Sequence, residues 1–130
     1  MDLCDTHVFT LIGEEGFARL VGAFYRRVRT DDILSPMYPR KDFEGAEARL
    51  RGFLIQRFGG PDTYSQQRGH PRLRMRHAPF RVDQRGRDRW VELMETALAE
   101  ADLPVQAHAP LRKFFLEAGT FMINSPSADR

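Results

Sequence analysis

The chain has almost no cysteine, since Cys4 is the only one among its 130 residues. It therefore cannot form an internal disulfide, which fits a reducing compartment, and we expect the protein to be cytoplasmic. The sequence also lacks an apolar run of membrane-spanning length, and its first residues do not have the basic and apolar regions of a signal peptide. Neither export nor membrane insertion is expected.

Short signatures of common enzymes are missing too. The sequence contains no Gly-x-Ser-x-Gly, His-Glu-x-x-His, P-loop or Gly-x-Gly-x-x-Gly pattern, so the usual motifs of hydrolases, metalloproteases and nucleotide-binding proteins are excluded. The four histidines do not have the spacing of a structural zinc site. The acidic pairs Glu14-Glu15 and Asp31-Asp32 are interpreted as helix-start charges rather than as an acid–base pair.

No alternation of apolar and polar residues predicts a strand, whereas apolar residues recur at spacings of three and four. This spacing predicts long helices over residues 14–29, from residue 42 to Gly59-Gly60, from residue 83 to about 101, and from Pro104 to Asn124-Ser125-Pro126. Asp83 is a candidate N-cap for the third of them. The pattern predicts an all-α fold, either a helical bundle or globin-like, with residues 1–130 forming one domain.

Two shorter segments connect these helices. Residues 61–69 have no helical or strand period and are rich in Pro, Gly, Ser, Asp and Gln, so we expect an ordered loop. After it, Pro71 can start a short helix that Pro79 must end. Pro36 and Pro39 predict an angular corner around Tyr38.

Positive charge is carried mainly by arginine, because 18 of the 20 basic residues are Arg and eight of them fall within residues 68–89. Guanidinium groups pair well with carboxylates and phosphates, so the segment could face an anionic ligand, nucleic acid or acidic helices. A small nucleic-acid-binding helical domain is therefore an alternative function. The interspersed Asp83 and Asp88, and the lack of a recognition motif, argue against it.

Three residues could carry chemistry in an otherwise apolar setting. His77 lies two residues before Pro79, near the end of the short helix, where it could bind a metal such as haem iron or act as a structural histidine. Tyr25 and Trp90 each bring a polar hydrogen to an apolar helix face. Such groups need an acceptor, which an internal residue or a bound polar ligand could supply.

Several of these segments resemble group II truncated haemoglobins. The resemblance is tightest at Phe58-Gly59-Gly60-Pro61, at Tyr64 and at residues 68–80. It continues less tightly over residues 17–126, including Phe24-Tyr25, Tyr38-Pro39, Gly45-Ala46-Glu47 and Arg89-Trp90. It implies a truncated globin, a two-over-two helical sandwich around haem b, with His77 as the proximal ligand of the iron.

The resemblance also implies the residues around the haem. Ala46 stands at the family's distal entry position, so the distal contacts to the gas would come from Tyr25, Tyr38 and Trp90, whose hydrogens can stabilise negative charge on a bound ligand. Three residues are expected to contact the haem propionates: Arg49, Tyr64 and Arg76. Five are expected to supply apolar haem contacts: Leu50, Phe53, Leu54, Phe80 and Met94.

The implied function is binding of dioxygen and other diatomic gases, for oxygen transport or oxygen-dependent redox chemistry. A haem peroxidase or a nitric oxide dioxygenase is the alternative within the family, and either would need a reductase as partner. We expect no nucleic acid or membrane partner, and a homodimer is a further candidate assembly. Two departures from the family are Gly13-Glu14, where paired glycines are frequent, and Phe58, where Trp is frequent.

Overall fold

The computed structural model of the chain describes residues 3–38, 42–68 and 83–123. Every regular element in these ranges is helical: α1 (Leu3–Val28), the 3-10 helix η1 (Ser35–Met37), α2 (Phe43–Arg57), α3 (Thr63–Arg68), α5 (Gln84–Glu100) and α6 (Val105–Phe121). The predicted all-α fold class is confirmed. The short helix predicted between Pro71 and Pro79 lies outside the described residues.

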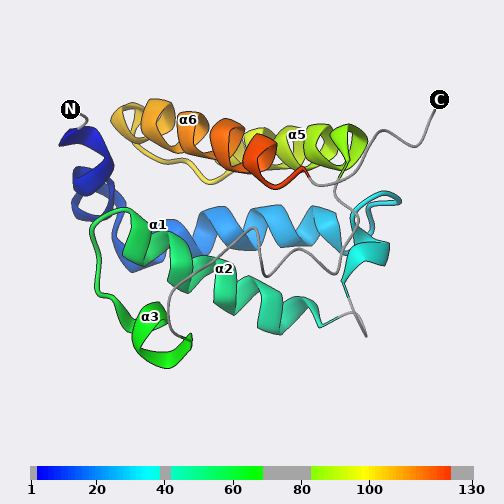
Figure 1. Cartoon of the computed structure of the whole chain (residues 1–130). Coiled ribbons are helices and arrows are strands. Elements are labelled where there is room, and N and C mark those ends of the chain that lie inside the picture. The colour runs from blue at the N-terminus through cyan, green and yellow to red at the C-terminus, as the bar shows by residue number, and fades with distance from the viewer. Residues whose placement is uncertain (1–2, 39–41, 69–82, 124–130) are drawn as a thin grey trace.

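The long helices form two layers (Figure 1). The first layer is α5 and α6, which lie side by side and are joined by a short connection at residues 101–104. The second is α1 and α2, and α1 packs against both helices of the first layer. This is the two-over-two arrangement that the sequence resemblance implied.

The core forms where α1 meets the other helices. The apolar residues that recur at spacings of three and four in α1 form one stripe, and all five are fully buried: Phe17, Leu20, Val21, Phe24 and Val28. It packs in one cluster with Met94 and Leu98 of α5 and Leu111 of α6. Burial of each large apolar side chain stabilises the fold by about 1.5–3 kcal/mol, so this stripe fixes α1 at the centre of the molecule.

Helix α1 is longer than predicted, because a helical segment precedes Gly13. At Gly13 the backbone has φ 65° and ψ −176°, a conformation open almost only to glycine, and the helix changes direction there. Glu14 and Glu15 then occupy the first turn after the kink, as expected for helix-start charges. The earlier segment is fixed by the stacking of Phe9 on Phe17 across the kink, at 6.5 Å between ring centroids, and by a hydrogen bond from the Phe9 N–H to the Phe58 carbonyl oxygen at 3.1 Å.

The prediction of a loop over residues 61–69 was wrong, because α3 forms within it. The side chain of Gln56 on α2 donates to Ser65 Oγ at 2.7 Å and accepts from the Ser65 N–H at 2.8 Å. Tyr64 is buried and its ring lies 5.7 Å from that of Phe53. Contacts with α2 thus stabilise a helix that local residue preferences do not predict.

Helix ends agree well with the capping residues in the sequence. Asp83 accepts a hydrogen bond from the Gly86 N–H at 2.9 Å, which confirms it as the N-cap of α5. Asp42 caps α2 in the same way through the Gly45 N–H at 3.1 Å. Gly59 follows the end of α2 with φ 103°, so the predicted glycine stop is confirmed.

Candidate distal ligand site

Two tyrosines meet inside the fold. Tyr25 lies in the last turns of α1 and is 4% exposed, whereas Tyr38 follows η1. Their hydroxyl oxygens are 3.3 Å apart, and either hydroxyl can donate the hydrogen bond. The rings meet edge to face with centroids 5.7 Å apart. The corner, residues 29–38 between α1 and α2, therefore brings together two phenols separated by 13 residues.

The corner is built by local hydrogen bonds. The Ser35 N–H donates to the Asp31 carbonyl oxygen at 3.0 Å, and the Met37 N–H donates to the Leu34 carbonyl oxygen at 2.9 Å. Pro36 lies inside η1, where its fixed φ suits a short turn. The angular corner predicted from the prolines is therefore confirmed, and it places Tyr38 against Phe43 at the start of α2, with centroids 5.5 Å apart.

Trp90 approaches from the other layer, on α5. Its indole ring packs edge to face against Phe24, at 5.8 Å, and against Phe115, at 5.6 Å. Phe24 also contacts Tyr25 at 5.0 Å, so Tyr25 and Trp90 flank the same ring. Trp90 is only half-buried, and no hydrogen bond joins its N–H to another residue in the described ranges.

Burial keeps both phenols protonated. It raises the pKa of Tyr25 far above its ordinary value, and the Tyr38 hydroxyl adds to that rise. Burial also raises the pKa of Tyr38, although the hydrogen bond with Tyr25 and the charge of Arg49 oppose it. At neutral pH the pair holds two hydroxyl hydrogens, of which their shared bond uses one. The other hydrogen has no acceptor among the described residues.

Helix α2 supplies the apolar side of this region. Ala46 is buried and offers no polar group, while Leu54 and Phe53 are buried and Leu50 is half-buried. Met94 of α5 is fully buried in the same core cluster. The buried residues that the structure describes in α2 are all apolar.

The predicted propionate contacts lie at the edges of α2 and α3. Arg49 is half-exposed, with Nη1 3.6 Å from Asp42 Oδ2, and its charge acts on both Tyr25 and Tyr38. Tyr64 is buried beside Phe53. Three predicted site residues lie outside the described residues: Arg76, His77 and Phe80.

A haem fits the described residues on two observations. First, Tyr25, Tyr38 and Trp90 carry hydrogen-bond donors on α1, the corner and α5. One tyrosine hydroxyl hydrogen and the Trp90 N–H have no acceptor among the described residues. The neighbouring α2 face is apolar and contains no buried charge among the described residues, which suits a flat hydrophobic macrocycle.

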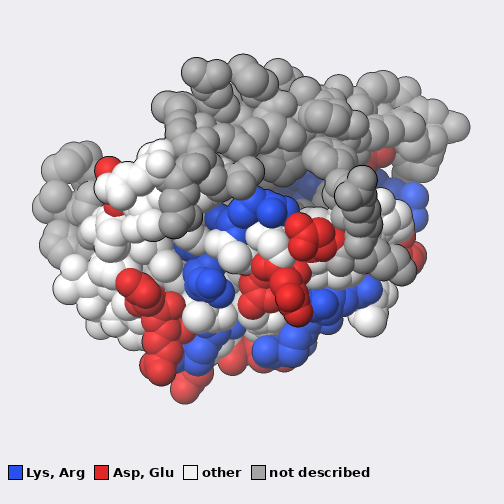
Figure 2. Space-filling model, turned by 90° about the horizontal axis from the view of Figure 1, so that it is seen from below, with Lys and Arg blue, Asp and Glu red and all other residues white. Residues whose placement is uncertain are grey.

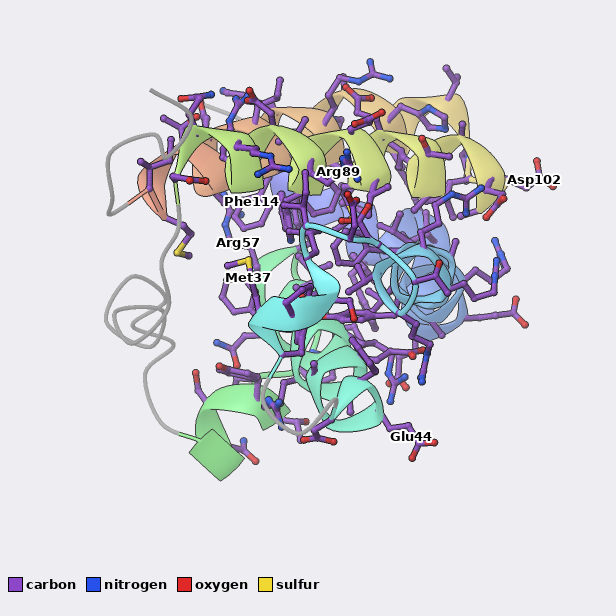
Figure 3. All side chains as sticks on the ribbon, turned by 90° about the vertical axis from the view of Figure 1, so that its right-hand side faces the viewer. Met37, Glu44, Arg57, Arg89, Asp102 and Phe114 are labelled. Atoms are coloured by element: carbon purple, nitrogen blue, oxygen red, sulfur yellow. The ribbon has the colours of Figure 1, made fainter. Side chains whose placement is uncertain are left out.

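Sequence reasoning missed one contact at this site. Asp31 and Asp32 do not start a helix, so that interpretation was wrong. Asp31 follows the end of α1 and pairs with Arg89 of α5, 58 residues away, and Arg89 also reaches Asp32. Arg89 is labelled in Figure 3. No spacing rule links residues so distant in sequence.

Charges on the surface are mixed rather than separated. Figure 2 shows blue and red side chains side by side on the described part of the face seen from below. Arg27 binds Glu100 through its two terminal guanidinium nitrogens, at 2.8 and 2.7 Å. Arg89, from the arginine-rich segment, is likewise paired with acidic residues, Asp31 and Asp32, which lie between α1 and η1. No helix in the described ranges is long and apolar enough to cross a membrane.

Comparison with known proteins identifies the family. The family model of the bacterial-like globins matches residues 7–121. The chain is 37% identical over 95 residues to the group 2 truncated hemoglobin YjbI of Bacillus subtilis, covering 73% of this chain and 71% of the relative. It is 33% identical over 122 residues to the two-on-two hemoglobin-3 of Arabidopsis thaliana, covering 92% of this chain and 70% of the relative.

Solved structures agree. The hemoglobin of Chloroflexus aurantiacus superimposes with a TM-score of 0.87 at 46% identity, covering 91% of this chain and 98% of that one. The group II truncated hemoglobin of Bacillus anthracis gives 0.88 at 30% identity, covering 94% of each chain. Globins carry haem and bind small gases at its iron. The chain therefore belongs to the bacterial-like globin family and, within it, to the group II truncated haemoglobins.

Proposed function

We propose that this protein binds haem b and reversibly binds dioxygen and other diatomic gases, with Tyr25, Tyr38 and Trp90 as the distal donors. The observation that carries the proposal is the pair of Tyr25 and Tyr38 hydroxyl groups inside the fold, whose oxygens are 3.3 Å apart. Their shared hydrogen bond uses one hydroxyl hydrogen and leaves the second without an acceptor among the described residues. His77 is proposed as the proximal ligand. When bound, haem supplies an iron with one position open to a gas.

The distal residues stabilise negative charge that develops on a bound gas. A phenol that stays protonated can donate a hydrogen bond, and burial raises the pKa of both Tyr25 and Tyr38. Donors held away from water interact more strongly than donors in solution. The Trp90 N–H adds a third donor from the opposite layer. We therefore expect tight dioxygen binding with slow dissociation.

The remaining proposed contacts hold the haem and exclude water. Apolar contacts are assigned to Leu50, Phe53, Leu54, Phe80 and Met94. Arg49, Tyr64 and Arg76 are assigned to the propionates, because a guanidinium or hydroxyl can donate to a carboxylate. The half-exposed position of Arg49 at the edge of α2 supports this assignment, since propionates lie toward solvent.

The direct test is visible absorption of the purified protein in the ferric, dithionite-reduced and oxygenated forms, beside a His77→Ala variant given the same haem. We expect a Soret band and a stable oxygenated form in the wild type that the variant lacks. If both proteins stay colourless, the haem proposal is wrong. If both bind haem alike, His77 is not the ligand.

The same donors would serve oxygen-dependent redox chemistry, as in a peroxidase or a nitric oxide dioxygenase. Such an activity needs repeated electron supply, so a reductase would be the partner. Steady-state turnover with added reductase distinguishes it from reversible binding. Sedimentation of the haem-loaded protein tests the homodimer. The cytoplasm remains the proposed location, on the basis of the single cysteine.

A further inference from the structure

The corner between α1 and α2 is tied to α5 by a protected ion pair. Arg89 Nη1 lies 2.5 Å from Asp31 Oδ1 and 3.1 Å from Asp32 Oδ1, and Arg89 Nε lies 3.4 Å from Glu92 Oε1. The Asp31 side chain is only 7% exposed and that of Arg89 is 30% exposed. Partial burial distinguishes this contact from exposed surface pairs, which contribute little.

Asp31 also organises the backbone of the corner. Its Oδ2 accepts from the Ile33 N–H at 3.0 Å and from the Leu34 N–H at 2.8 Å. The Leu34 carbonyl then accepts from Met37 at 2.9 Å, and the Tyr38 N–H bonds within the same 3-10 turn at 3.2 Å. The Asp31 carboxylate therefore holds the start of the turn at Ile33 and Leu34, and the backbone hydrogen bonds of Met37 and Tyr38 continue that turn as far as Tyr38.

The carboxylate of Asp31 is charged in this setting. Burial acts to raise its pKa, but hydrogen bonds from the Leu34 N–H, Arg89 and the Ile33 N–H outweigh it and hold the pKa below its ordinary value. The contact with Arg89 is thus a full ion pair at neutral pH.

The other end of the ion pair lies beside the third distal donor. Arg89 directly precedes Trp90 on α5, and Figure 3 shows Arg89 extending from α5 toward the corner that carries Met37. Building on the proposed function, we propose that the Asp31–Arg89 ion pair is a positioning contact that fixes Tyr38 relative to Trp90 across the gas site. Neither residue needs to touch the gas.

The test uses two variants of the full-length protein loaded with haem. Arg89→Met removes the charge but keeps the aliphatic length, and Asp31→Asn keeps a side-chain oxygen for the backbone N–H groups. In both we expect the C–O stretching band of the carbon monoxide complex to move to higher wavenumber and to broaden, because fewer donors point at the ligand. Dioxygen dissociation should become faster by about tenfold, the effect of losing one hydrogen bond.

Arg112→Met is the matched control. It removes an arginine that likewise pairs with another element, since Arg112 of α6 lies 2.8 Å from Glu95 of α5, but this pair is exposed. We expect this control to keep the wild-type C–O band. Arg89→Lys should shift the band less than Arg89→Met, because the lysine ammonium group keeps the positive charge but cannot make all the hydrogen bonds of the planar guanidinium.

Two outcomes overturn the inference and are separable from each other. If the wild type binds haem and carbon monoxide but both variants match the Arg112→Met control, the ion pair only stabilises the fold and the proposed function stands. If the wild type binds no haem, the proposed function fails and this inference fails with it. If Arg89→Met does not fold, the C–O band of the Asp31→Asn variant tests the inference by itself.

Discussion

Single residues carry the chemistry of this site, and their pairing has a measurable consequence. Tyr25→Phe and Tyr38→Phe each remove one hydroxyl of the 3.3 Å pair. We expect dioxygen to dissociate faster by about tenfold in each, because the remaining hydroxyl loses the hydrogen bond that orients it toward the ligand. Stopped-flow displacement of dioxygen by carbon monoxide measures the rate.

The double variant tests whether the two phenols act as a unit. Because each hydroxyl orients the other, the effects should not multiply, and the double variant should dissociate dioxygen more slowly than the product of the single effects predicts. Independent, multiplicative effects would contradict the pairing seen in the structure. A conservative Leu116→Met change on α6, away from both tyrosines, serves as the control.

The raised pKa values of the two phenols predict loss of stability in alkali. In the folded state both values lie above 10.0, the ordinary value for tyrosine. The stability from keeping these phenols protonated is therefore complete below pH 10.0 and declines above it, because the unfolded chain then ionises while the folded chain does not.

Urea unfolding at neutral pH and above pH 10.0 checks this, with Tyr25→Phe for comparison. Wild-type stability should fall by about 1.4 kcal/mol more per pH unit than that of the variant, since one such group is removed. Equal alkaline slopes would show that Tyr25 ionises as readily in the folded chain as in the unfolded one.

For single residues, the sequence predicts which side chains are buried better than it predicts which residues contact each other. The helical spacing placed Phe24 on the apolar stripe of α1 and Tyr25 on an apolar helix face, and both are buried. The hydrogen bond to Tyr38 could not be derived from spacing, because it depends on how the corner turns after α1 ends. The Asp31–Arg89 pair joins two elements distant in sequence, so only the folded arrangement reveals it.

Helices were predicted well wherever a local signal marked their ends. Asp83 and Gly59 bound α5 and α2 as expected, because an N-cap side chain and a positive φ are properties of one or a few neighbouring residues. Helix α3 was missed because its stability comes from Gln56 and Phe53 on another helix. The segment of α1 before Gly13 was missed for a similar reason.

The kink in α1 gives a prediction at the scale of one element. Gly13→Ala would place a Cβ in open space, yet at φ 65° and ψ −176° the backbone itself is strained for alanine. We expect a loss of about 1–3 kcal/mol in unfolding free energy. Gly22→Ala is the matched change in the same helix, where an added Cβ would come no closer than 3.6 Å, to Glu47 Oε2.

Gly22→Ala should be neutral or stabilising by up to about 1 kcal/mol, because alanine favours a helix. Opposite signs at the two positions, measured by urea unfolding, would establish that Gly13 is required for its backbone conformation. Equal losses would point instead to crowding of α1 against its neighbours.

For the whole molecule, α2 differs from the other long helices in its packing partners. Helices α5, α6 and α1 pack on one another around a common core, whereas α2 packs mainly on α1 and α3. Helix α2 meets α6 chiefly through aromatic contacts, in which Phe53 and Phe58 lie 6.1 and 5.4 Å from Phe114. If α2 forms one wall of the haem site, the cofactor adds contacts to a helix that is joined to the α5–α6 pair chiefly through Phe114.

This asymmetry predicts where haem stabilises the protein. A ligand that binds only the folded state raises the free energy of unfolding, by about 4 kcal/mol at a thousandfold excess over its dissociation constant. Amide hydrogen exchange should therefore slow most in α2 and α3 when haem is added, and least in the α5–α6 pair, whose packing does not depend on it. His77→Ala should reduce this protection. Equal slowing in all helices, or protection confined to α5 and α6, would place the haem elsewhere than against α2.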